Sequence, residues 1–120
     1  MSLLGERLAG PRVCLEAAGG AEYRVVRVVD RVELGRVALE EADGALVVRA
    51  LCIDEAHRGY GAGSGAAALL REAWAADGRW RVLRAYAPQG AGLAVYYWMR
   101  MGLRPVGTGL EGGLVLERGK

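Results

Sequence analysis

The stretch from Ala45 to Ser64 decides the fold, and it reads Ala-Leu-Val-Val-Arg-Ala-Leu-Cys-Ile-Asp-Glu-Ala-His-Arg-Gly-Tyr-Gly-Ala-Gly-Ser. Its first part, Ala45–Ile53, is a nearly continuous apolar run, which is typical of a strand buried on both faces. The part that follows is polar and glycine-rich, and from Ser64 to Ala76 strong helix formers dominate. The sequence therefore predicts a central strand, a glycine turn and a helix in direct succession.

The segments on both sides of this stretch predict the rest of a mixed sheet. Residue composition and periodicity indicate strands over Arg12–Ala17, Tyr23–Val29 and Val32–Glu40, then a strand over Trp80–Ala87, a helix over Ala91–Met101 and a closing pair of strands over Leu103–Arg118. Because a helix joins the central strand to Trp80–Ala87, these two strands are expected to be parallel in an otherwise antiparallel sheet. The expected fold class is α/β (α+β), in one domain that covers residues 1–120.

Composition and charge exclude several classes of protein. The chain has 120 residues, of which 52% are hydrophobic and 25% charged, a balance that is ordinary for a globular domain. The net charge is only +2 and the basic residues are scattered, so a nucleic-acid partner is not indicated. No stretch approaches the roughly 18 apolar residues of a membrane span. No basic segment leads into a long apolar one, so we expect a cytoplasmic protein without a membrane partner.

The two cysteines are expected to be reduced thiols in the core. Cys14 and Cys52 lie far apart in the sequence, and they match no Cys or His spacing of a metal site. The sequence therefore predicts no metal centre, and a chain of this length needs no disulfide to be stable.

The glycine-rich turn has the properties of an anion site. A turn from a buried strand into a helix exposes backbone N–H groups that lack partners, beside the positive end of the helix dipole. Glycines in the turn keep side chains away from those amides and permit a positive φ. Arg58 would add a charge-assisted contact. The residues predicted to bind a phosphate or pyrophosphate are Arg58, Gly59, Tyr60, Gly61, Ala62, Gly63 and Ser64.

Two other interpretations of this turn have to be weighed. Glycine-rich turns before helices also occur for purely structural reasons. Gly61–Ala66 also satisfies the pattern GxGxxA of dinucleotide-binding proteins. In that pattern the glycines follow the strand almost directly, whereas here Asp54–Tyr60 intervenes, and the next predicted strand has no acid at its end for a ribose. A Walker loop is excluded because no GK[ST] follows.

Two segments together resemble the GNAT N-acetyltransferase superfamily. Ile53–Gly63 is similar to the signature of that family, an apolar strand end followed by a short polar link and [Q/R]xxGx[G/A]. Further along the chain, Tyr97–Gly107 resembles its helix-to-strand segment, an aromatic helix followed by Gly-Phe-Arg. The two segments occur in the expected order with a predicted strand between them, and the resemblance covers about residues 26–106.

The resemblance implies that the cofactor is acetyl-CoA and that its acetyl group moves to a primary amine of a small molecule or peptide. In the family the pantetheine arm lies between splayed parallel strands, which here would be Leu51–Ile53 and Arg84–Ala87. A backbone N–H near Cys52 or Ile53 would then stabilise negative charge on the acyl oxygen. The alternative function, from another class, is a non-catalytic module that binds acyl-CoA or regulates a partner.

A tyrosine often protonates the leaving thiolate in this family. Counting back from Gly102 without a gap places Trp98 at that position, and indole is no useful acid. Alignment on Pro88 instead places Tyr97 there, and one step on a helix rotates a side chain by about 100°. The sequence favours Tyr97 as the acid and leaves Tyr96, or water, as alternatives.

The sequence does not select a general base, and it departs from the family near the acceptor. His57, the single histidine, precedes Arg58 and is a candidate base. The candidate carboxylates are Glu33, Glu40, Glu41, Asp54 and Glu55. Too few residues separate the first two predicted strands for the helices that shape the acceptor pocket in related proteins. The acceptor side is therefore expected to be open or completed by a second subunit, and exposed apolar area would favour a homodimer.

Overall fold

The computed structural model describes residues 2–120, and at position 110 it describes the backbone alone. The elements are β1 (Arg7–Leu8), β2 (Val13–Gly19), β3 (Glu22–Arg27), β4 (Glu33–Ala42), β5 (Ala45–Ile53), η1 (Glu55–His57), α1 (Ala62–Ala76), β6 (Val82–Ala87), α2 (Gly92–Arg100), β7 (Arg104–Thr108), η2 (Leu110–Gly112) and β8 (Leu114–Gly119). Within the described residues, the strands form one eight-stranded sheet in the order β1-β2-β3-β4-β5-β6-β8-β7.

The predicted topology is confirmed. Neighbouring strands are antiparallel except for β5 and β6, which run parallel and are joined by α1. The bounds of Ala45–Ile53 agree with the prediction, whereas α1 begins at Ala62, two residues before the predicted start. The short strand β1 was not predicted, because two residues are too few to show periodicity. Only residues 20–21 separate β2 from β3, so no helix fits between them.

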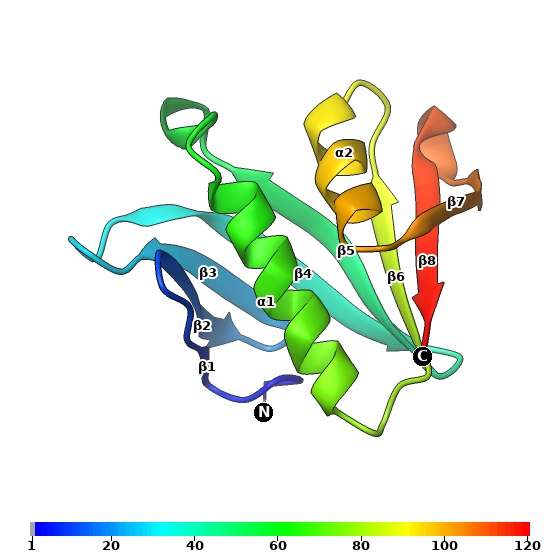
Figure 1. The fold of residues 1–120 in the computed structure, drawn as a ribbon, viewed down its shortest axis with the longest axis horizontal. Helices are drawn as coiled ribbons and strands as arrows, with labels where there is room; N and C mark the ends of the chain where they lie inside the picture. The colour runs from blue at the N-terminus through cyan, green and yellow to red at the C-terminus, as the bar shows by residue number, and fades with distance from the viewer. Residues whose placement is uncertain (1) are drawn as a thin grey trace.

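The parallel pair β5 and β6 is joined over only part of its length. Their register runs from Ala45 opposite Val82 to Val48 opposite Ala85, and no pairing follows beyond this point. The next residue of β5, Arg49, forms a bulge. Ala38 and Leu39 are adjacent on β4 and pair with Ala50 and Val48, so Arg49 between these two has no partner on β4. Such a bulge bends a strand and strengthens its twist. Figure 1 shows β5 and β6 side by side near the lower right and diverging toward the top, with α2 over the gap.

This divergence corrects the prediction that Ala45–Ile53 is buried on both faces. The first four residues, Ala45–Val48, are buried, but Arg49 and Cys52 are exposed. The expectation of two core thiols is wrong for the same reason: Cys14 is buried, whereas Cys52 is exposed. Because β6 has moved away at this level, one edge of the second half of β5 has no neighbouring strand.

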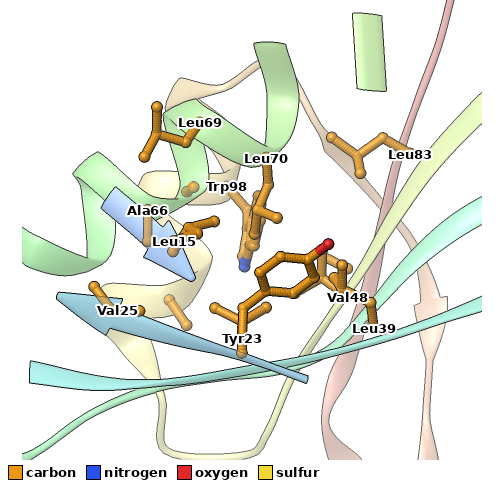
Figure 2. Packing of buried hydrophobic residues seen from close by; sticks show 14 of the residues in the cluster. Leu15, Tyr23, Val25, Leu39, Val48, Ala66, Leu69, Leu70, Leu83 and Trp98 are labelled. Carbon is orange, nitrogen blue, oxygen red and sulfur yellow. The ribbon is translucent and has the colours of Figure 1, made fainter. Parts of the chain in front are cut away.

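Both helices pack on the same face of the sheet and enclose the core with it (Figure 1). The core cluster combines strand residues with the apolar faces of α1 and α2, and it includes Trp74, Trp80 and Trp98, each at most 2% exposed. Figure 2 shows Trp98 of α2 pointing into this cluster, toward the sheet residues Tyr23 and Leu15. The indole of Trp98 therefore packs in the core between α2 and the sheet.

The opposite face of the sheet carries charged side chains. Arg36 pairs with Glu22 and Glu33, and Arg84 pairs with Glu117. The exposed large apolar side chains lie mainly outside the strands, at Val28, Val29, Tyr60, Leu93, Tyr96 and Met99, with Val106 in β7. The dimer stays a prediction. No helix within residues 2–120 is both long and apolar enough to cross a membrane.

Candidate functional site

A cavity of about 580 Å³ occupies the gap that β5 and β6 leave between them. Its walls are residues 50–53 of β5, the turn that leads into α1, the first residues of α1, the connection from β6 to α2, and the inner face of α2. The cavity is lined from both sides of the sheet, for example by Cys52 on the face without helices and by Tyr97 of α2 on the face with helices. The cavity therefore passes through the sheet at the point where the strands part.

The glycine turn brings unpartnered backbone amides to one end of this cavity. Gly61 is the N-cap of α1 with a φ of 82°, and no side chain caps the helix. The first N–H group with a partner inside the helix is that of Gly65, which donates to the Gly61 carbonyl at 2.9 Å. The amides of residues 62–64 precede it and are left to bind a ligand. Gly59, with a φ of 89°, makes the preceding bend, a conformation that other residues rarely adopt.

The structure brings the predicted cofactor residues together, with one exception. Those that line the cavity are Cys52, Ile53, Arg58, Gly59, Gly61, Ala62, Gly63 and Ser64. Tyr60 is 78% exposed and lines a second cavity, of about 730 Å³, on the other side of α1. Tyr60 lies between two glycines with positive φ, so its side chain turns away from the cofactor cavity.

Arg58 connects the turn to the end of β5. Its Nε donates a hydrogen bond to the Ile53 carbonyl at 2.8 Å, and its side chain is otherwise exposed. This bond holds the turn over the open end of the strand pair. It also places a permanent positive charge beside the amides of α1, where an anion would bind.

The direction of the β5 amides follows from the ladder with β4. Asp54 donates its N–H to the Leu34 carbonyl of β4 at 2.8 Å. Because amides alternate along an antiparallel strand, Cys52 also directs its N–H to β4, whereas Leu51 and Ile53 direct theirs to the side that β6 has left. Of the two amides that the sequence left open, the ladder favours Ile53. Cys52 contributes its exposed thiol to the wall instead.

Three aromatic residues of α2 have three different environments. Trp98 is 1% exposed, and its ring packs edge-on against Tyr97 with centroids 6.2 Å apart. Tyr96 is 56% exposed, with the Arg100 guanidinium 5.5 Å from its ring centre. Tyr97 is half-buried in the cavity wall. All three residues line the cavity, and Tyr97 is the one of the two phenols that is also shielded from water.

The pKa of Tyr97 is raised above its ordinary value of 10.0. Burial is the main cause, negative charge on Cys52 would add to it, and the positive charge of Arg58 opposes it. A phenol with a raised pKa keeps its proton through the neutral range. Tyr97 would accordingly be present in the cavity as a proton donor.

The acidic residues considered as bases lie outside the cavity. Among the described residues that line it, none is an aspartate or a glutamate. Glu33 and Glu40 pair with arginines, and Glu41 accepts a hydrogen bond from the Trp80 indole at 2.8 Å. His57 does line the cavity and is half-buried. It is thus the one residue considered as a base that the fold brings to the site.

Tyr86 belongs to Arg84–Ala87, the strand that the resemblance places beside the pantetheine arm, but the sequence did not single out its side chain. Tyr86 lies at the end of β6, where its side chain borders both the cavity and the β7–β8 connection. An added Cβ on Gly109 would lie 2.5 Å from the Tyr86 ring, and one on Gly113 would lie 2.5 Å from the Tyr86 hydroxyl oxygen. The alternation of β6 could have indicated that this side chain lies opposite the core face.

Comparison with known proteins identifies the architecture. No protein-family model and no curated protein matches the sequence. Among solved structures, a Sphaerobacter thermophilus protein assigned as an acetyltransferase is similar over 98% of this chain and 100% of its own, with a TM-score of 0.78 and 12% identity. A GNAT-family acetyltransferase of Bacillus anthracis is similar over 86% of this chain and 68% of its own, with a TM-score of 0.74 and 10% identity.

A third solved structure carries a ligand. Naa50 of Arabidopsis thaliana, in complex with the bisubstrate analogue CoA-Ac-MVNAL, is similar over 82% of this chain and 72% of its own, with a TM-score of 0.67 and 13% identity. Identities this low establish the arrangement of the chain rather than its activity. The order of strands, the single parallel pair that parts over a cavity, and these likenesses agree: this chain has the fold of the GNAT N-acetyltransferases.

Proposed function

We propose that the protein is an acyltransferase that moves an acetyl group from acetyl-CoA to an amine. One observation carries this proposal: β5 and β6 part after Val48, and the cavity that they leave has the unpartnered amides of α1 at its end. A long, thin cofactor with an anionic middle needs both features. The CoA-containing analogue bound to Arabidopsis Naa50, a protein of similar fold, supports the choice of cofactor.

The residues present fit CoA. The amides of residues 62–64 and the Arg58 guanidinium would hold the pyrophosphate, since a helix N-terminus and a nearby arginine both favour negative charge. The uncapped Gly61 leaves the space in front of these amides free, because an added Cβ would meet no atom within 4 Å. The apolar part of the cavity beyond the turn, beside Leu51 and Ala94, would receive the pantetheine arm.

Each group in the wall would have a distinct part in the transfer. Acetyl-CoA, when bound, supplies the acetyl group as an activated thioester. The Ile53 amide, which points to the open side of β5, would donate a hydrogen bond to the acyl oxygen and stabilise charge that develops there. Tyr97 would hold the proton that the departing sulfur requires. His57 or water would take the proton that the attacking amine loses.

The acceptor would approach from the sheet face that carries no helix. On this face the cavity opens beside Cys52 and Tyr86, and only two residues join β2 to β3. An open approach fits an exposed amine on a small molecule or a peptide. A second subunit could complete this side, and light scattering at tens of micromolar tests for the dimer: a monomer alone would contradict it.

Release of free thiol tests the proposed activity. The protein is mixed with acetyl-CoA and a panel of primary amines that includes amino acids, polyamines and short peptides, and CoA is measured as it appears. We expect release that depends on both the protein and the amine. Mass spectrometry should then find the acceptor heavier by one acetyl group.

A non-catalytic module that binds acyl-CoA is the second candidate function. The observation that favours it is the cavity wall, where the described residues include no carboxylate and a buried tryptophan stands next to Tyr97. Such a module would bind CoA in a calorimeter and release no thiol with any amine. The same two measurements therefore separate the two functions, and absence of CoA binding would contradict both.

A further inference from the structure

Gly63, in the first turn of α1, lies against the ring of Tyr97. A Cβ added to Gly63 would be 2.9 Å from Tyr97 Cε1 and 3.0 Å from Cζ and from the hydroxyl oxygen. Carbon atoms in ordinary contact are about 3.5–4.0 Å apart. The three atoms nearest to that position all belong to Tyr97. The ring can therefore occupy its place only because residue 63 has no side chain.

The Tyr97 ring is also restrained by its neighbour. Trp98 packs edge-on against it at an interplanar angle of 64°, and Trp98 is itself held in the core (Figure 2). Tyr97 thus lies between a fixed tryptophan and the backbone of Gly63. A side chain at 63 would press on the ring and displace it toward its solvent-exposed side.

From this contact we infer that Gly63 is a positioning residue for Tyr97: its missing side chain holds the phenol inside the cofactor cavity. The inference rests on the proposed function, in which Tyr97 is the acid. It gives Gly63 a task separate from phosphate binding, because an alanine at 63 would keep the backbone N–H that an anion needs. A Cβ added to Gly61 would have no atom within 4 Å, so of these two glycines only Gly63 positions Tyr97.

The chain offers a matched control for the test. Gly65 is also in the first turns of α1, and an added Cβ there would lie 3.0 Å from Val13 Cγ2, away from Tyr97. Gly63→Ala and Gly65→Ala therefore add the same methyl group to the same helix, under similar crowding. Both gain the helix propensity of alanine, so their difference reports the neighbour that each methyl meets.

The experiment follows the ionisation of Tyr97 by ultraviolet absorbance, with Tyr97→Phe as the reference that identifies its signal. In the wild type we expect Tyr97 to ionise above its ordinary value, because the ring is buried. In Gly63→Ala the ionisation should return toward the ordinary value as the ring moves into water, and in Gly65→Ala it should stay raised. A raised value that persists in a folded Gly63→Ala variant would overturn the inference.

Kinetics and binding then separate this inference from the proposed function. Gly63→Ala should lower kcat about ten-fold or more while the affinity for CoA changes less than about three-fold. If CoA does not bind to the wild type, the proposed function fails, and the absorbance titration still decides the position of Tyr97. If Gly63→Ala does not fold, the double variant Gly63→Ala, Tyr97→Ala is tested, because it removes the ring that the new methyl group would press on. Recovery of folding supports the contact, and continued failure to fold contradicts it.

Discussion

The two halves of β5 are both mainly apolar, but their surroundings differ. Ala45–Val48 is paired with β4 on one side and β6 on the other, and all four residues are buried. From the bulge at Arg49 onward the strand keeps β4 and loses β6, and the cavity takes the place of the missing neighbour. One continuous strand therefore provides both the rigid base of the sheet and the wall of the candidate site.

This difference shows how the sheet can open at one end of β5 while the other end keeps the packing that stabilises the fold. The lower half in Figure 1, Ala45–Val48, supplies the packing, because Leu46 and Val48 belong to the same core cluster as Leu83 of β6. The upper half is Arg49–Ile53. The upper half has backbone groups that find no partner in β6, and these are the groups that a ligand could use. Stability and binding are thus expected to depend on different ends of the same strand.

The largest expected effect is on stability, at the lower half. Leu46→Ala should lower the free energy of unfolding by about 2–5 kcal/mol, since Leu46 is fully buried and its removal leaves a cavity. Leu51→Ala makes the same change in the upper half, where the side chain is only partly buried, and should cost less than half as much. Urea denaturation measures both. Equal losses would mean that the two halves do not differ in packing.

A large effect on binding is expected at the turn above the upper half. Gly61→Val should weaken CoA binding about 30-fold or more, because valine resists a φ of 82° and shields the amides of α1. Gly44→Val is the control, since Gly44 has a φ of 77° in the turn before β5, far from the cavity in the fold. Calorimetry should find CoA affinity unchanged in that control. A similar loss in both variants would attribute the effect to strain in general.

A moderate effect is expected at Tyr97, which faces the upper half. Tyr97→Phe should lower kcat at least ten-fold with little change in the affinity for acetyl-CoA, because a general acid usually contributes about 10²- to 10⁴-fold. Tyr96→Phe is the matched control, and its exposed side chain should leave kcat within two-fold of the wild type. A loss below three-fold in both variants would indicate that water protonates the sulfur.

A smaller effect is expected on stability at alkaline pH. Burial raises the pKa of Tyr97, so above about pH 10 the folded state keeps a proton that the unfolded chain has lost. The folded state then binds more protons, and its stability falls as the pH rises through the folded-state value. Tyr97→Phe should make this fall shallower. Unfolding curves between pH 9 and 11 measure it, and an unchanged slope would show that the ring is not buried.

The smallest effect is expected at Cys52, on the exposed face of the upper half. Cys52→Ala should change the free energy of unfolding by less than about 0.5 kcal/mol, as substitutions at exposed sites usually do. Cys14→Ala should cost more, because Cys14 is fully buried. Thermal unfolding compares the two. Equal costs would contradict the difference in burial between the thiols.

The sequence by itself determined the order of the elements, the parallel pair and the glycine turn. These features follow from local properties, since apolar runs, helix formers and glycines each act over a few neighbouring residues. Gly61 and the start of α1 could be identified for this reason, and so could the resemblance to GNAT proteins.

The tertiary structure alone decided where β5 and β6 part, which amides face the gap and how deeply each aromatic residue of α2 is buried beside it. The apolar run of β5 does not reveal that pairing ends at Val48, because pairing depends on the twist of a strand far away in the sequence. Trp98 and Tyr97 are adjacent and both border the cavity, and only packing against the sheet and against Gly63 buries the indole in the core and leaves the phenol half-buried in the cavity wall. Contacts between distant residues made these choices, and no local pattern contains them.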